Sequence, residues 1–183
     1  MIYILVALKV ELPNIDGLDK SKFKVCYTGV GKINATISAT LAANLPSCER
    51  IINFGTAGTL DPKLVGNLYE IGIVRQRDMD ARPQADLGVT PFENTSIDGD
   101  ITLNPKVNII LSTGDNFVKN KPEMFSHLVD MEGYAIAKVG RMFSKPTTLF
   151  KYASDMADEE APKTWVENQA DGAISFLELL EKL

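Results

Sequence analysis

The sequence predicts a single-domain α/β protein, and three observations carry that prediction. The chain has 183 residues, 45% of them hydrophobic, which is enough for one substantial core and short for two domains. Ile2–Leu8 is a nearly continuous apolar run of strand length, as expected for a central strand that is covered on both faces. Segments typical of a strand, a glycine turn and a helix then follow one another, and the order recurs along the chain.

The first strand, turn and helix are predicted within residues 23–44. Phe23–Thr28 alternates apolar and polar side chains, and Gly29-Val30-Gly31 interrupts it, so we expect a strand and a tight turn. From Lys32 to about Asn44, apolar residues recur every four positions, which predicts a helix. The apolar stripe expected to pack on the sheet consists of Ile33, Ile37 and Leu41.

Further apolar runs bounded by turn residues predict the remaining strands. They lie at Arg50–Phe54, Leu68–Val74, Val107–Leu111 and Thr147–Ala153. The residues Gly55-Thr56-Ala57-Gly58 are interpreted as a turn. Arg75–Asp100 is polar, rich in Asp, Pro and Gly, and too long for an ordinary connection, so we expect a functional or interface loop there.

Three helices are predicted in the second half of the chain. Lys121-Pro122-Glu123 would begin a short helix, because proline is tolerated in a first turn. Glu132–Phe143 would carry Ile136, Val139 and Phe143 inward. A last helix is expected from about Thr164 to Leu183. Its predicted apolar stripe is Val166, Ala170, Ala173, Leu177 and Leu180.

Composition excludes several classes of function. The net charge is −5 and no basic run is present, so the electrostatic footprint of a nucleic-acid-binding protein is absent. Cys26 and Cys48 lack metal-ligand spacing and fit a reducing compartment. His127 is the only histidine, which leaves little basis for a histidine zinc site or a Ser-His-Asp triad. Ile2–Leu8 lacks a basic flank and meets Lys9 and Glu11 at once, so we expect no signal peptide, no membrane span and a cytoplasmic protein.

A Met-Glu pair ends the apolar run at Leu128–Ala135. Asp130 and Glu132 flank Met131, just before the predicted helix. If the run is a buried strand, Glu132 stands at its carboxyl end, where open α/β sheets place ligands, and it is a candidate for binding hydroxyl groups. An equally weighted alternative is an acid in the first turn of a helix, favoured by the helix dipole.

Other motifs have structural readings of their own. Gly29-Val30-Gly31-Lys32 could cradle a phosphate, but it lacks the rest of a P-loop or dinucleotide fingerprint, and a tight turn is favoured. The two glycines of Asn53–Gly58 would let backbone amides approach a ligand, although a plain turn is again the simpler reading. Ser154-Asp155 fits a helix cap, yet four acids in six residues exceed what capping needs. Phe117 is either a core residue or a stacking platform for a flat ring.

Several of these motifs occur together and in order along the chain. The segments are Ala7–Glu11, Thr28–Ala35, Asn53–Gly58, Thr113–Val118, Val129–Glu132 and Ala153–Asp158. Together they resemble the methylthioadenosine/S-adenosylhomocysteine nucleosidases of the nucleoside phosphorylase superfamily. The resemblance runs nearly end to end, and its most specific parts are the Met-Glu and Ser-Asp-x-Ala-Asp segments. It implies a single-domain, three-layer α/β/α fold around a central mixed sheet, like that of the nucleoside phosphorylases.

The resemblance also implies a purine nucleosidase that splits a 5′-thio-substituted adenosine into base and sugar, with no metal or organic cofactor. Glu11 would activate the attacking water, and Asp155 would protonate the purine. An acid near the base and anions near the sugar both lower the barrier, because charge separates as the N-glycosidic bond breaks. The substrate-binding residues it implies are Met131 and Glu132 for the ribose, Phe117 and the Val118 backbone for the base, and Thr56 and Gly58 on the ribose and water side.

Three features depart from the family pattern. Lys151, near the water site, replaces a typical arginine and cannot offer the same bidentate fork. Gly133-Tyr134 follows the Met-Glu pair where smaller residues are usual, and the region between Asp78 and Asn108 lacks a helix found in longer relatives. Water positioning and the pocket for the 5′ substituent are therefore the least determined parts of the site.

Two alternatives and an assembly stay open from the sequence. A phosphorylase of the same superfamily would need basic groups around a phosphate, which Glu11 would repel. A nucleoside-binding protein without turnover is disfavoured by the intact acids but kept open by Lys151. We also expect a homodimer, with the Arg75–Asp100 loop and its Pro91 and Phe92 at a twofold interface.

The raised pKa that Asp155 needs as an acid is expected from its acidic neighbours Asp158, Glu159 and Glu160.

Overall fold

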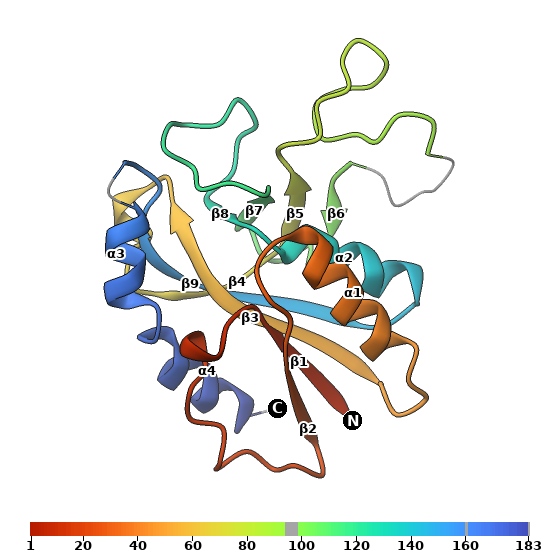
Figure 1. Ribbon diagram of the computed structural model, residues 1–183, viewed down its shortest axis with the longest axis vertical. Coiled ribbons are helices and arrows are strands. Elements are labelled where there is room, and N and C mark those ends of the chain that lie inside the picture. The colour runs from red at the N-terminus through yellow and green to blue at the C-terminus, as the bar shows by residue number, and fades with distance from the viewer. Residues whose placement is uncertain (94–98, 160, 183) are drawn as a thin grey trace.

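The computed structural model describes residues 1–93, 99–159 and 161–182. Within them, nine strands form one sheet, in which β2, β1, β3, β8, β7, β5 and β6 lie in that order and β9 and β4 continue from β3 (Figure 1). The strands are β1 (Ile2–Val6), β2 (Phe23–Tyr27), β3 (Arg50–Thr59), β4 (Leu68–Glu70), β5 (Ile73–Gln76), β6 (Ile101–Thr102), β7 (Ile110–Thr113), β8 (Leu128–Asp130) and β9 (Thr147–Met156). The α-helices are α1 (Lys32–Ala43), α2 (Gly133–Met142), α3 (Ala161–Asn168) and α4 (Gly172–Leu180), and two 3₁₀ turns are η1 (Lys9–Glu11) and η2 (Pro62–Leu64).

β3 is the strand that joins the two parts of the sheet. Its first half pairs in parallel with β1, and its last residues, Gly58 and Thr59, pair antiparallel with β8. Along its other edge it pairs in parallel with β9 over its whole length. β4 and β6 add antiparallel pairs at β9 and β5, so the sheet is mixed, as expected.

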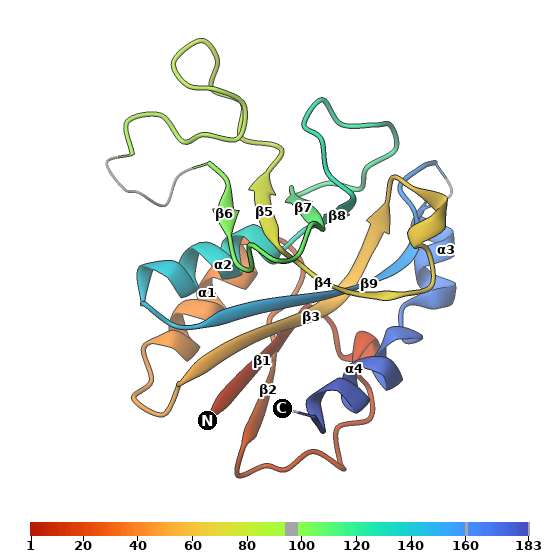
Figure 2. The ribbon, with the colours of Figure 1, turned by 180° about the vertical axis from the view of Figure 1, so that it is seen from behind.

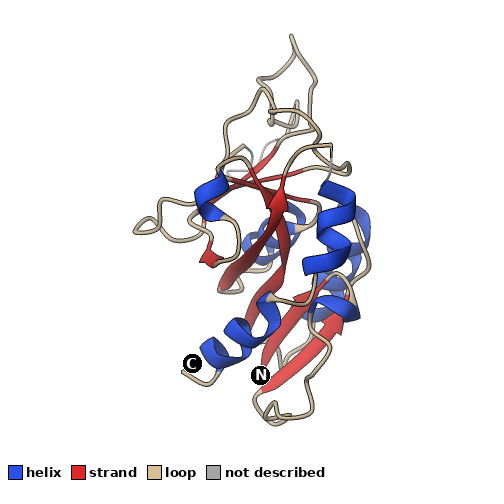
Figure 3. Ribbon diagram, turned by 90° about the vertical axis from the view of Figure 1, so that its left-hand side faces the viewer, coloured by secondary structure: helices blue, strands red, loops and turns tan. Residues whose placement is uncertain are grey.

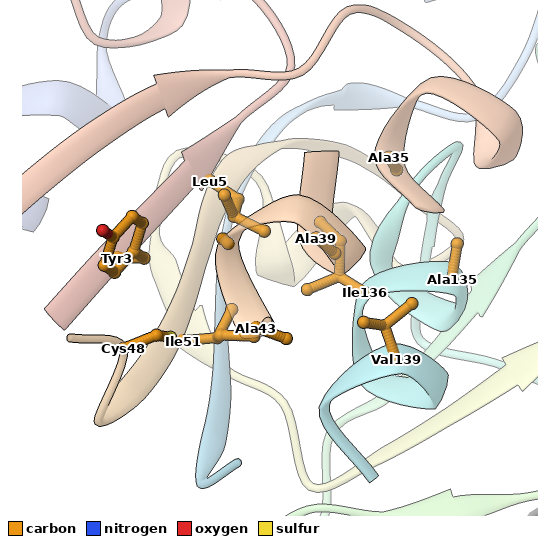
Figure 4. Close-up of a cluster of buried hydrophobic side chains, with 11 residues drawn as sticks. Tyr3, Leu5, Ala35, Ala39, Ala43, Cys48, Ile51, Ala135, Ile136 and Val139 are labelled. Atoms are coloured by element: carbon orange, nitrogen blue, oxygen red, sulfur yellow. The ribbon is translucent and has the colours of Figure 1, made fainter. Parts of the chain in front are cut away.

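Helices cover both faces of the sheet, which confirms the three-layer α/β/α architecture. Because successive strand residues point to opposite faces, Tyr3 and Leu5 of β1 pack with α1 and α2, as Figure 4 shows, whereas Ile4 and Val6 pack with α4. Seen from the side, the helices flank the strands on both sides (Figure 3). None of the helices in the described part of the chain combines the length and apolar character needed to cross a membrane.

The apolar stripe predicted for α1 does not face the sheet. Ile33, Ile37 and Leu41 are 74%, 54% and 67% exposed, and this prediction was wrong. The buried face of α1 consists of alanines, Ala35, Ala39, Ala42 and Ala43, that pack against β1, β3 and α2. Small side chains let α1 approach the sheet and α2 closely, and the larger residues are left on the outer surface.

Two strands are longer than predicted, and one predicted strand is two. β3 continues through the Gly55–Gly58 segment that was interpreted as a turn. β9 continues to Met156, so Asp155 is a strand residue and not a helix cap. Leu68–Val74 divides at Ile71 and Gly72 into β4, which pairs with β9, and β5, which pairs with β6 and β7. A side chain at Gly72 would collide with the carbonyl of Val107.

The predicted helices differ at three places. α2 buries Ile136 and Val139 as expected, while Phe143 is its partly exposed C-cap. Lys121–Glu123 is not helical, consistent with the restriction that Pro122 places on the residue before it. The C-terminal helix breaks before Gly172, which packs directly on the Tyr152 ring, so that α3 and α4 are separate. Leu183 lies outside the described residues.

Two long loops gather at one end of the sheet. The loop after β5 and the loop between β7 and β8 both project beyond the same end (Figures 1 and 2). Lys32 at the start of α1 bonds Asp78 of the first loop at 2.6 Å, and the backbone N–H of Lys32 donates to Asp115 of the second at 2.8 Å. The loops and α1 therefore form one wall beside the strand ends.

Candidate active site

A cavity of about 260 Å³ opens where β1, β3, β8 and β9 end. The loop after β7 and helix α3 form its other walls. Eight of the nine residues predicted for the site line it: Glu11, Thr56, Gly58, Phe117, Val118, Met131, Glu132 and Asp155. The segments identified from separate motifs therefore meet in one place.

Glu11 is held at the cavity by three backbone and side-chain donors. It lies in η1, directly after β1, and its carboxylate is buried. Oε1 accepts from the backbone N–H and the hydroxyl of Thr56, both at 2.8 Å, and Oε2 accepts from the backbone N–H of Leu8 at 3.0 Å. These donors fix the orientation of the carboxylate group.

Gly55 and Gly58 matter because side chains approach β3 closely. A Cβ at Gly55 would lie 3.3 Å from both Glu11 Oε1 and Lys151 Nζ. A Cβ at Gly58 would lie 3.2 Å from Asp155 Oδ2. These glycines leave room for the charged groups of the site, and their role is close packing within a strand, not a turn.

Glu132 stands after β8, at the N-cap of α2. Its Oε1 accepts the Gly31 N–H at 2.8 Å, so the glycine turn before α1 contacts the carboxylate itself. Burial, together with the neighbouring Asp130, raises the pKa of Glu132 to about 7. A buried carboxylate at a strand end suits the hydroxyl-binding reading, because ribose hydroxyls would supply donors to it.

Lys151 does not line the cavity but lies behind it. It is fully buried on β9 and forms an ion pair with Asp130 at 2.9 Å. Burial lowers the pKa of Lys151, but Asp130 and Glu132 outweigh burial and raise it above its usual value. Asp130 also accepts the Gly133 N–H at 2.7 Å and bonds the Thr113 hydroxyl. Lys151 thus neutralises a cluster of buried acids and is placed to act on substrate only through them.

Asp155 is buried close to the end of β9. The register between β3 and β9 shifts at this point, so that Ala57 pairs with Ala153 but Gly58 pairs with Asp155, and Ser154 is the extra residue. Such a bulge redirects the side chains that follow it. Burial raises the pKa of Asp155 to about 6, the Ser154 hydroxyl opposes the rise by donating to Oδ1, and Asp158 adds to it. Burial, rather than the acidic neighbours alone, is therefore the main cause, and Glu160 lies outside the described residues.

Two aromatic residues, Phe117 and Trp165, line the cavity. Phe117 is 47% exposed and faces the edge of Trp165, with ring centroids 6.4 Å apart, so it is not a core residue. Val118 beside it is buried. A half-exposed ring at a cavity is available for stacking on a flat base.

Arg77 lines the cavity, supports the loop that carries Phe117, and was not identified from the sequence. Its guanidinium donates to four backbone carbonyls, at Ser112, Gly114, Asn116 and Asp130, at 2.7 to 3.0 Å. The carbonyls belong to the ends of β7 and β8 and to the loop that carries Phe117. Only the fold brings these groups to one arginine, and no local motif marks it.

Trp165 is the second residue that sequence reasoning missed. It lies on α3, lines the cavity, and its indole N–H donates to the Thr56 hydroxyl at 2.8 Å. The only signal in the sequence is that it is the single tryptophan of the chain.

The sequence and the fold are similar to those of known nucleosidases. The chain is 30% identical over 188 residues to the 5′-methylthioadenosine/S-adenosylhomocysteine nucleosidase of Staphylococcus carnosus (strain TM300), an alignment that covers 89% of this chain and 81% of the relative. The fold is similar to that of the Helicobacter pylori nucleosidase of the same name with butyl-thio-DADMe-Immucillin-A, with a TM-score of 0.85 and 21% identity, covering 100% of this chain and 98% of that chain. It is also similar to native futalosine hydrolase of Helicobacter pylori strain 26695, with a TM-score of 0.83 and 22% identity, covering 100% and 97%. No protein-family model matches the chain. The identity and coverage of the curated relative, on top of the shared fold, show that the chain belongs to the 5′-methylthioadenosine/S-adenosylhomocysteine nucleosidase family.

Proposed function

We propose that this protein hydrolyses the N-glycosidic bond of a 5′-thio-substituted adenosine, such as 5′-methylthioadenosine or S-adenosylhomocysteine. The observation that carries the proposal is the contrast between two carboxyl groups in one cavity. Glu11 accepts three hydrogen bonds, whereas Asp155 is buried with its pKa raised to about 6. A hydrolase of this bond needs one carboxylate as a base and one carboxylic acid as a proton donor.

In the proposed reaction, the water oxygen attacks the anomeric carbon of the ribose while the bond to the purine breaks. Glu11 takes the proton of the water, and Asp155 gives its proton to a ring nitrogen of the departing purine. The products are the free base and a sugar with a hydroxyl at the anomeric carbon. The sugar carries positive charge in the transition state. Asp130, Glu132 and Glu11 outnumber the single cation Lys151 among them, so this group of acids offsets the charge on the sugar.

The remaining cavity residues fit the parts of such a substrate. Glu132 accepts hydrogen bonds from the ribose hydroxyls, and Met131 packs beside the sugar. Phe117 stacks on the purine, and the Val118 backbone bonds its edge. Apolar lining at Leu8, Val30 and Ala161 suits the thioether at the 5′ position.

A phosphorylase is the weaker assignment. Arg77 is the single cation among the described residues that line the cavity, and its guanidinium is engaged by four carbonyls. Glu11 would also repel a phosphate at the position of the attacking water.

Product analysis tests the proposal. Purified protein is incubated with 5′-methylthioadenosine, S-adenosylhomocysteine, adenosine and inosine, in phosphate-free buffer and in phosphate. We expect free adenine and free thioribose at equal rates in both buffers. A strict phosphate requirement with a sugar 1-phosphate product would establish the phosphorylase instead, and tight binding without turnover would establish a binding protein.

We also propose a homodimer that uses the outer face of α1. The exposed aliphatic stripe Ile33, Ile37 and Leu41 would be costly to leave in water, and Phe92 on the neighbouring loop is 90% exposed. The loop is joined to the helices of this face by the Lys32–Asp78 and Lys138–Glu93 ion pairs. A second copy that covers this face would also cover the predicted interface loop, of which residues 94–98 lie outside the described part.

A further inference from the structure

Trp165 connects helix α3 to the carboxylate that is proposed to activate water. Its indole Nε1 lies 2.8 Å from the Thr56 hydroxyl oxygen, and that oxygen lies 2.8 Å from Glu11 Oε1. The three residues come from α3, β3 and η1, more than 100 positions apart at the extremes. They form a continuous chain of hydrogen bonds along one side of the cavity.

The direction of each bond in this chain is fixed by chemistry. An indole N–H can only donate, so the Thr56 oxygen must accept from Trp165. A hydroxyl has one proton, and with its oxygen accepting from the indole that proton is free to point at Glu11, which as a carboxylate can only accept. Without the indole, the Thr56 hydroxyl could rotate toward other acceptors or toward water.

We propose that Trp165 is a positioning residue for water activation, which acts by fixing the Thr56 hydroxyl so that it donates to Glu11. The inference rests on the proposed hydrolytic function for its kinetic consequence, but the hydrogen-bond chain itself does not. Bonds in such a chain polarise one another, so the indole strengthens the bond that Thr56 makes to Glu11.

The arrangement also links the position of α3 to the hydrogen bonding of Glu11. α3 contributes Ala161 and Trp165 to the lining and is anchored to β9 by Asn168, whose side-chain amide donates to the Ser154 carbonyl at 2.9 Å. Only when α3 is docked does the indole reach Thr56. The indole therefore supports the bond between Thr56 and Glu11 only while α3 is docked at the cavity.

A double-mutant cycle separates this role from a merely structural one. Trp165→Phe keeps an aromatic wall but removes the N–H, and we expect kcat to fall about tenfold, the worth of one well-placed hydrogen bond. In a Thr56→Val background, where no hydroxyl remains to be fixed, the same substitution should change kcat by less than about twofold. In the matched Thr56→Ser background the tenfold loss should return. Any KM change from the smaller ring should be similar in all backgrounds.

Asn168→Ala is the control for loosened docking of α3. It removes the anchor to β9 without touching Thr56, and because the indole reaches Thr56 only from a docked α3, its kcat loss should also be smaller with Val than with Thr at position 56. Equal kcat losses for Trp165→Phe in the Thr56 and Val backgrounds would overturn the proposal, because Trp165 would then act only as a wall or as a support for α3.

A spectroscopic measurement tests the chain without turnover. Since the protein has one tryptophan, its indole N–H gives a single assigned resonance in a ¹H–¹⁵N spectrum. We expect this resonance to move upfield in Thr56→Val and, by the polarisation of the chain, in Glu11→Ala, but to stay in place in Thr56→Ser. An indole resonance unaffected by Thr56→Val overturns the positioning role. Failure of the unsubstituted protein to release any purine would instead refute the proposed function, while the resonance shifts would still decide whether Trp165 holds Thr56 toward Glu11.

Discussion

At the scale of single residues, the two carboxyl groups proposed to be catalytic have different surroundings. Glu11 accepts three hydrogen bonds, whereas Asp155 is buried and its pKa is raised. The roles proposed for the two groups follow from that difference. Asp155→Asn keeps size and most hydrogen bonding but removes the proton, so turnover should fall by roughly 10²–10⁴-fold, as for loss of general acid catalysis. Nucleoside binding should largely survive, as measured by titration calorimetry.

The nature of the leaving group distinguishes the two acids. A p-nitrophenyl riboside needs no protonation to leave, so it should restore much of the rate of Asp155→Asn. Glu11→Gln should show no such recovery, because water must be activated whichever group departs. Similar responses of both variants to the better leaving group would remove Asp155 from its assigned role.

The raised pKa of Asp155 predicts the pH dependence of the reaction. The group donates a proton only while it is protonated, and its pKa is about 6 in the folded protein. As pH rises through about 6, the protonated fraction declines, so kcat/KM for 5′-methylthioadenosine should fall on the alkaline side. The residual activity of Asp155→Asn should lack this limb. A kcat/KM that is flat between pH 5 and 8 in the unsubstituted protein would contradict the assignment.

The placement of the site was predictable for residues that sit in local motifs. Glu132 follows an apolar run, and Asp155 follows a serine in a run of acids, so each carries a signal in its neighbours. Arg77 and Trp165 carry none, because their partners are carbonyls and a hydroxyl brought in from distant segments. Lys151 was expected near the water but lies behind the acids, since Gly55 on the adjacent strand leaves space for its ammonium group there.

At the scale of elements, the periodicity of the sequence predicted where helices and strands lie but not which face of the first helix is buried. A helix was correctly predicted from residue 32, yet its buried face consists of alanines, which a search for large apolar residues passes over. Glycines were read as turns at Gly55–Gly58, where they serve close packing within β3. Both errors have the same physical cause: where elements approach closely, small side chains are inside, and pattern alone does not say how close they come.

Arg77 joins three elements and predicts a loss of stability when it is removed. Arg77→Met would remove the guanidinium donor from the carbonyls of Ser112, Gly114, Asn116 and Asp130. The Asp130 carbonyl keeps the Gly114 N–H, but a buried carbonyl left without any donor costs about 1–3 kcal/mol. We expect the free energy of unfolding in urea to fall by at least about 2 kcal/mol. The loop that carries Phe117 should also lose its support, so that KM rises more than kcat falls.

Arg82→Met is the matched control for this prediction. Arg82 lies in the same loop region and bonds Asp80 and Glu123, but it is exposed, and exposed ion pairs add little to stability. It should leave the unfolding curve almost unchanged. Equal effects of the two substitutions would mean that the carbonyl contacts of Arg77 do not hold the strand ends together.

At the scale of the whole molecule, the outer face of α1 stays exposed in the described part of the chain. The sheet is covered by α1 and α2 on one face and by α4 on the other, and the outer surface of α1 carries Ile33 and Ile37 next to the loop after β5. Asp78 of the same loop forms an ion pair with Lys32 at the edge of the cavity wall. A partner that covers this face would therefore also affect the position of that wall. That continuity is why we assign the face to a second copy of the chain: a twofold contact would bury the stripe and brace the cavity in both copies at once.

The dimer prediction is tested by placing a charge in the middle of the stripe. Ile37→Asp should convert the protein from dimer to monomer at micromolar concentration in sedimentation velocity, because burying an unpaired carboxylate in the contact is strongly unfavourable. Ile174→Asp is the matched control: Ile174 is 70% exposed on α4, away from α1, and its replacement should leave the dimer intact. We expect the monomeric Ile37→Asp variant to keep its fold by circular dichroism but to lose activity, since the loop beside the cavity is no longer braced. An unsubstituted protein that is monomeric and fully active would show that the exposed stripe serves neither assembly nor the site, whereas a fully active Ile37→Asp monomer would show that the stripe serves assembly alone.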